Sequence, residues 1–136
     1  MTAASWAVQR ALHAALTTSP SVLAVLGGPR IYDDVPRGAA YPYMSFGLST
    51  VRDWSTGNED SDEHVVTLHV WSQAPGRQEA QEIIAVVRAA LHDQSLALTG
   101  HRLINLRHEF SDTRREADAE TFHGIVRFRA VTEPVG

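Results

Sequence analysis

Hydrophobic and polar residues alternate along residues 64–72, and apolar residues then recur at helical spacing after Gly76. In the first segment Val66, Leu68 and Val70 share one face of an extended chain, and the residues between them share the other. In the second segment the apolar residues recur every three or four positions, which places them on one stripe of a helix. That stripe consists of Ala80, Ile83, Ile84, Val87 and Leu91. The two segments predict a half-buried strand followed by a helix that covers one face of a sheet, with Gly76 as the helix N-cap.

The rest of the chain divides into further elements by the same criteria. Apolar residues at spacing four predict a helix over residues 4–17, and Ser19-Pro20 predicts the capped start of a short helical turn that ends at Gly27. Other segments with strand character are residues 31–35, 43–54, 96–98, 101–110 and 121–132. Polar loops are predicted over residues 55–63, between two antiparallel strands, and over residues 111–120.

The order of these elements, with helices and runs of strands in turn, predicts an α+β fold. We expect a mainly antiparallel sheet with two principal helices packed on one face. A length of 136 residues suits a single domain over residues 1–136 that is large enough to bury a core. The centre of that core is expected to hold Phe46, Leu68, Val70, Ile83, Val87 and Phe128.

Composition narrows the classes of function. A net charge of −4 argues against a DNA-binding surface over the whole molecule, and the absence of cysteine excludes disulfides and thiolate metal sites. No apolar run approaches the roughly 20 residues of a membrane span, and the first residues lack the pattern of a signal peptide. All twelve basic residues are arginine, a bias that a GC-rich coding sequence explains and that also supplies the better interface cation.

Seven histidines invite a metal-binding or catalytic interpretation, but their spacing does not support one. His64 and His69 lie five apart on a predicted strand and therefore face opposite sides, and no His-x-His or His-Glu-x-x-His motif occurs. The sequence has no Gly-x-Ser-x-Gly nucleophile elbow, and the acidic loop lacks the glycine and the final glutamate of a calcium loop. The residues alone therefore give no support for a metal site or a serine nucleophile.

Several short stretches together resemble the tail-completion (tail-terminator) proteins of long-tailed phages and phage-like gene transfer agents. One segment of that family is similar to Arg30-Ile31-Tyr32-Asp33-Asp34-Val35-Pro36 followed by Tyr41-Pro42-Tyr43-Met44-Ser45-Phe46-Gly47. The strand–helix unit of the family is similar to Leu68-His69-Val70-Trp71-Ser72, then Gly76-Arg77-Gln78-Glu79-Ala80 and Val87-Arg88-Ala89-Ala90-Leu91. The order of these stretches, the chain length and the N-terminal helix fit the family as well, so the resemblance covers nearly the whole chain.

The resemblance implies a structural role in a virion and no catalysis: no catalytic residue, no metal, no cofactor, and a chain that is not an enzyme. Members of the family assemble into a ring, typically a hexamer, that ends the tail tube and joins it to the head-completion or stopper protein. The expected partners are therefore other copies of the chain, the tail tube protein and the stopper, with DNA passing through the channel without specific binding and no membrane involved. The expected location is the head-proximal end of the tail of a phage or phage-like particle, assembled in the bacterial cytoplasm. The alternative is a small-ligand-binding or enzyme-subunit α+β domain, which would be a monomer with one deep polar pocket.

Two groups of opposite charge are the candidate subunit interface. The acidic group consists of Glu59, Asp60, Asp62 and Glu63, and the basic group consists of Arg114, Arg115, Arg127 and Arg129. Pairing of one group with the other group on the next subunit would give the heterologous contact that a ring requires, although plain solvation explains both groups equally well. The loop of residues 57–63 carries four carboxylates and no apolar anchor. We expect it to be mobile in an isolated subunit and ordered after assembly.

Overall fold

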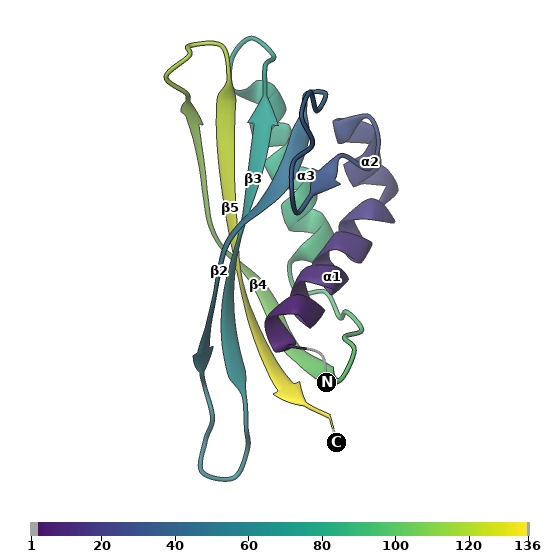
Figure 1. Ribbon diagram of the computed structural model, residues 1–136, viewed down its shortest axis with the longest axis vertical. Coiled ribbons are helices and arrows are strands. Elements are labelled where there is room, and N and C mark those ends of the chain that lie inside the picture. Colours follow the sequence, from purple (N-terminus) through teal and green to yellow (C-terminus); the bar gives the residue numbers. More distant parts are fainter. Residues whose placement is uncertain (1–2, 136) are drawn as a thin grey trace.

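A computed structural model describes residues 3–135 of the chain, which form three helices and one five-stranded sheet. The helices are α1 (Ala4–Thr17), α2 (Pro20–Leu26) and α3 (Gln78–Leu91). The strands are β1 (Ile31–Tyr32), β2 (Tyr43–Asp53), β3 (Asp62–Ser72), β4 (His101–Arg115) and β5 (Phe122–Pro134). All three helices lie against one face of the long, twisted sheet (Figure 1). The predicted α+β class is confirmed.

Two long hairpins build most of the sheet, whose strand order is β1-β2-β3-β5-β4. β2 pairs with β3, and β4 with β5, in antiparallel hairpins, while β3 and β5 pair antiparallel along the middle. The two-residue β1 adds one short parallel pair beside β2. One hairpin turn directly precedes β3 and the other directly precedes β5, and these two strands run in opposite directions. The β2–β3 turn and the β4–β5 turn therefore project from opposite ends of the sheet (Figure 1).

The core lies between this sheet and α3, as the apolar stripe of the helix predicts. All five residues of the stripe are buried, and the inward face of β5 supplies Phe128 to the same cluster. Of the six predicted core residues only Phe46 is not fully buried, although it packs against the core. The pairing of β2 with β3 shifts between Phe46 and Ser49, so strict alternation fails there. Leu48 is in consequence 71% exposed.

Several predicted boundaries are wrong. β4 runs on to Arg115, so residues 111–115 belong to a strand and not to a loop, and only residues 116–121 form the turn. Residues 96–98 form no strand beyond the single bridge between Ala97 and Arg102. The N-cap of α3 is Arg77, because Gly76 adopts a left-handed conformation with φ of 85°. The cap of α2 is as predicted, since the hydroxyl of Ser19 accepts a hydrogen bond from the Val22 amide.

His64 is a fully buried residue of β3, and we expect it to make the folded protein less stable at acid pH. Its Nε2 lies 2.8 Å from the Thr132 hydroxyl, and its Nδ1 has no partner among residues 3–135. Burial lowers the pKa of His64 below its usual value, more than the nearby Asp62 raises it. Below about pH 6.5 the unfolded chain then binds a proton that the folded chain resists, so the free energy of unfolding falls as pH falls. The fall should reach at most about 1.4 kcal/mol per pH unit for this histidine.

Urea unfolding between pH 7.5 and pH 5 measures this effect. The matched variant is His64→Leu with Thr132→Val, which removes both hydrogen-bonding groups together and leaves neither buried without a partner. We expect the variant to show a shallower dependence of unfolding free energy on pH than the wild type. Equal slopes for the two proteins would show that His64 does not carry the acid sensitivity.

Candidate functional site

Of the basic group of the predicted interface, Arg114 and Arg115 lie at the end of the sheet opposite to the acidic group. Asp62 pairs with Thr132 at one end of β3, and Ser72 pairs with Phe122 at the other. Arg115 lies beside Phe122, at the end remote from the turn between β2 and β3, residues 54–61, which we call the acidic turn. Since β3 has 11 residues, about 35 Å separates the two ends at a rise of roughly 3.3 Å per residue. The β2–β3 turn of one subunit therefore cannot pair with Arg114 or Arg115 of the same subunit.

Glu63 and Arg129, from opposite predicted groups, are paired within one subunit. Nε of Arg129 donates to Glu63 Oε2 at 2.5 Å, and Nε of Arg52 lies 2.9 Å from Oε1. Both guanidinium groups also lie 5.1 Å from the ring centre of Trp54. The hydrogen bond from Arg129 is the largest cause of a lowered pKa for Glu63, and it outweighs the effect of desolvation. Sequence reasoning missed Arg52, which lies on β2 directly opposite Glu63, and Trp54, which directly follows β2.

The remaining arginines of the predicted interface also have local contacts. Arg114 donates to Asp112 at 3.0 Å. The guanidinium of Arg115 lies 5.1 Å from the ring centre of Phe122, and that of Arg127 lies 5.1 Å from the ring centre of Phe110. By contrast, within residues 3–135 no ion pair engages Glu59, Asp60 or Asp62. Pairing of the two groups between subunits stays a prediction. The acidic residues have fewer contacts within the subunit than the arginines do.

The loop predicted over residues 57–63 ends at Ser61, because Asp62 and Glu63 belong to β3. The acidic turn that remains has few bonds of its own, so its mobility can be tested. Reciprocal amide bonds link Thr56 and Glu59, at 2.9 and 3.3 Å, but the tip residues Gly57 and Asn58 make none within the described chain. We expect the amides of Gly57, Asn58 and Asp60 to exchange with solvent rapidly in the free subunit and at least tenfold more slowly after assembly. Hydrogen-exchange mass spectrometry of the two states measures this. Strong protection of these amides in the free subunit would contradict the prediction.

The sheet face opposite the helices carries a row of aromatic rings and histidines. The rings of Trp71 and His123 stack with centres 3.9 Å apart and planes at 9°. Nδ1 of His69 lies 2.6 Å from Nε2 of His123, whose Nδ1 donates to Glu116 at 2.6 Å. A Cβ at Gly47 would lie 2.2 Å from the His69 ring, so only glycine fits beneath that ring. Strand alternation alone places His69 and His123 outward, but the register that joins them comes from pairing of strands far apart in the chain.

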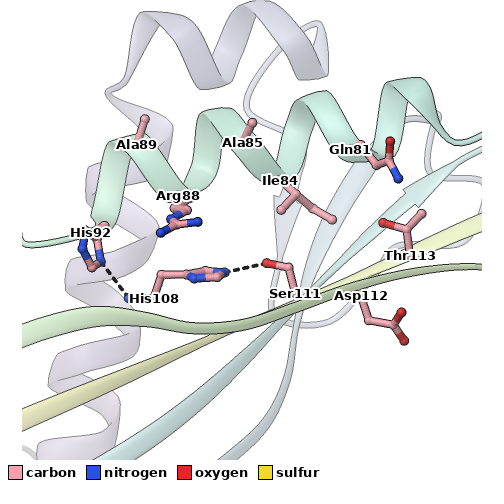
Figure 2. Close-up of a pocket in the computed structure, with 10 residues that line it drawn as sticks. All are labelled: Gln81, Ile84, Ala85, Arg88, Ala89, His92, His108, Ser111, Asp112 and Thr113. Carbon is pink, nitrogen blue, oxygen red and sulfur yellow. Dashed lines mark hydrogen bonds between the residues drawn. The ribbon is translucent and has the colours of Figure 1, made fainter.

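A groove of about 930 Å³ lies between α3 and β4 on the helical side of the sheet (Figure 2). His108 lies at the base of the groove and is fixed by two contacts. Its backbone amide donates to His92 Nδ1 at 2.9 Å, and its Nε2 lies 2.6 Å from the Ser111 hydroxyl. Burial lowers the pKa of His108, and the charge of Arg88 across the groove lowers it further. Burial therefore favours the neutral form of His108, and the charged residues of the groove lining are Arg88 and Asp112.

The chemistry of these surfaces is that of protein contact. Among residues 3–135 no three histidine, aspartate or glutamate side chains come together in a way that could hold a metal ion. None of the helices in that range is both long and apolar enough to cross a membrane. The side chains gathered at the described surface are charged groups at two ends, an aromatic row and those that line the open groove.

Comparison with known proteins gives these surfaces a context. The family model of the tail completion protein gp17 matches residues 10–133. A chain from the virion of a native gene transfer agent particle is 29% identical, with a TM-score of 0.89 over 98% of this chain and 99% of that chain. The gp17 protein of bacteriophage SPP1 is 22% identical and shares the fold, with a TM-score of 0.63 over 98% of this chain and 91% of that chain. No curated protein sequence matches the chain. This chain belongs to the gp17 family of tail completion proteins, and it is a structural protein of the tail of a phage or phage-like particle.

Proposed function

We propose that this chain forms a ring, most simply a hexamer, that ends the tail tube and joins it to the head-completion protein. The observation that carries the proposal is the likeness to the gene transfer agent virion chain, which extends over nearly the full length of both chains. A tail-completing ring must contact different proteins on its two faces and like subunits at its sides. The elongated sheet, with one hairpin turn at each end, offers separate surfaces for these contacts (Figure 1).

The charge of the chain fits a role around a DNA channel. Two chemically different ends, one with Glu59 and Asp60 and the other with Arg114 and Arg115, support binding of different partners at each end. The net charge of −4 disfavours adhesion to the phosphate backbone of DNA passing through the ring. The chain therefore acts by assembly, and it needs no catalytic residue to do so.

Mass photometry of the purified protein over a range of concentrations tests the ring. We expect a closed species at a fixed multiple of the 14.9 kDa subunit, six for a hexamer, that grows at the expense of the monomer as concentration rises. Such a species has no open ends and therefore does not extend into longer polymers. A protein that stays monomeric at high concentration, or that polymerises without limit, would contradict the proposal.

The groove between α3 and β4 supports a second candidate, a small-ligand-binding domain. Its volume of about 930 Å³ is in the range of ligand sites. The two candidates predict different behaviour: a ligand-binding domain stays monomeric and gains thermal stability with the ligand, whereas a tail-completing subunit gains stability by assembly. Thermal unfolding at low and high protein concentration separates them, because only the second shows a melting temperature that rises with concentration.

A further inference from the structure

We propose that the groove between α3 and β4 receives the acidic turn between β2 and β3, residues 54–61, of a neighbouring copy. This inference rests on the proposed ring and names the joint between its subunits. It differs from the pairing predicted from the sequence, because the acceptor is a shaped groove rather than the exposed Arg114 and Arg115.

The groove offers a cation without a partner. Arg88 projects from α3 into the groove, above the ring of His108 (Figure 2). Within the described residues no carboxylate lies within ion-pair distance of Arg88. The acidic residue on the groove wall, Asp112, already accepts a hydrogen bond from Arg114 at 3.0 Å. The groove is therefore electropositive, and it holds several polar groups that could bond to an inserted peptide, including the Ser111 hydroxyl and the Gln81 amide.

The turn offers the complementary anions. Glu59 and Asp60 are exposed and take part in no ion pair within the described chain. Below them the hairpin is closed by the bond from the Trp54 amide to the Ser61 carbonyl at 2.9 Å and by the bond from the Ser61 amide to the Ser55 hydroxyl at 3.1 Å. The turn therefore projects beyond the sheet, with its two free carboxylates next to the tip residues Gly57 and Asn58 (Figure 1).

The placement of the two surfaces makes the contact intermolecular and directional. The turn extends from β2 and β3, whereas the groove lies beside the edge strand β4, with β5 between them. Turn and groove also lie toward opposite ends of the sheet, since Ser111 and Thr113 pair with β5 near the end that is remote from Asp62. A subunit cannot fill its own groove. Contact from one edge of a subunit to the opposite edge of the next is heterologous, which closes a ring when the rotation is suitable.

Only one part of the β4 edge beside the groove is open to a neighbouring subunit. At its middle the strand edge is capped, because the Asp93 amide donates to the Leu106 carbonyl at 2.8 Å and His92 accepts from the His108 amide. Past this cap β4 continues to Arg115 as an edge strand along the groove wall. Capping one part of an edge and leaving another part open is a way to confine association to one place.

Site-directed crosslinking tests the joint directly, because the natural chain contains no cysteine. One chain carries Asp60→Cys, and a second chain carries a cysteine on the groove wall of α3, at Gln81, Ala85 or Ala89 in three separate variants. After mixing and mild oxidation we expect a disulfide-linked dimer for at least one of the three pairs, since a disulfide requires Cα atoms within about 7 Å. The matched control pairs each groove variant with Arg37→Cys, on an exposed loop outside the proposed joint, which should give less than a tenth of that product.

Charge reversal provides an independent readout. Arg88→Glu should raise the concentration for half-assembly at least tenfold at low salt, and adding Glu59→Arg and Asp60→Arg in the same chain should restore most of the loss. Arg37→Glu is the matched control and should assemble as the wild type does. Unchanged circular dichroism and melting of the Arg88→Glu subunit at low concentration exclude misfolding as the cause.

The outcomes separate this inference from the proposed ring. If the wild type forms a ring while no groove pair crosslinks above the control, or while Arg88→Glu assembles normally, the joint is wrong and the ring stands. A crosslink from Asp60→Cys to Arg114→Cys instead would favour the pairing predicted from the sequence. A wild type that remains monomeric overturns the ring and the joint together.

Discussion

Substitution of Val87 by aspartate is expected to abolish folding. Val87 is fully buried on the inner stripe of α3, against the β3 and β5 faces of the sheet. A carboxylate there would have no hydrogen-bonding partner, and burying it costs several kcal/mol. That cost is comparable with the whole stability of a typical domain, about 5–15 kcal/mol. Circular dichroism and urea unfolding of the purified variant measure the effect.

Ala85→Asp provides the matched control for this prediction. Ala85 lies two residues earlier on the same helix and is exposed in the subunit, so at protein concentrations too low for assembly the same side chain there should cost less than about 1 kcal/mol. A soluble Val87→Asp protein that unfolds cooperatively near the wild-type urea concentration would mean that the inner face of α3 is assigned wrongly.

Gly124→Leu should destabilise the protein by about 1–3 kcal/mol, because a side chain at this position has no space. Gly124 lies on β5 opposite Val70, directly beneath α3. A Cβ there would lie 2.9 Å from Ile84 Cδ1 and 3.2 Å from Val70 Cβ. The methyl group of Ile84 can rotate away, but Val70 Cβ belongs to the backbone-fixed part of the central strand. The helix or the sheet would therefore have to shift.

Gly57→Leu is the matched control, since nothing lies within 4 Å of a Cβ added at that glycine. Its unfolding free energy should stay within about 0.5 kcal/mol of the wild type. Equal stability of the Gly124→Leu and Gly57→Leu proteins would contradict the close approach of α3 to β5.

Local patterns were sufficient to predict the elements whose burial is one-sided. The stripe on α3 and the inward face of β5 follow directly from helical and strand periodicity. Where alternation is interrupted, the same reasoning fails. The register shift after Phe46 turns Leu48 to solvent, and the only local sign of that shift is Gly47, since a glycine within a strand often marks a bulge. Residues 111–115 are polar yet extended, because pairing with β5 overrides their composition.

The candidate surfaces depend more strongly on contacts between distant segments. The sequence identifies the charged residues but not that Glu63 bonds to Arg129, 66 residues away. It likewise cannot place Arg88 opposite His108, since that requires knowing that β4 forms the sheet edge beside α3. What the sequence does supply is the family: the stretches from Arg30 to Gly47 and from Leu68 to Leu91 lie within the region matched by the gp17 family model.

If this chain ends the tail tube and joins it to the head, as we propose, cells that lack only this gene should make defective particles. Electron microscopy of particles from such cells should show over-long tails, or tails unattached to heads. Supplying the wild-type chain in trans should restore attached tails of normal length. Tails of normal length attached to heads in the absence of this chain would show that it does not complete the tail.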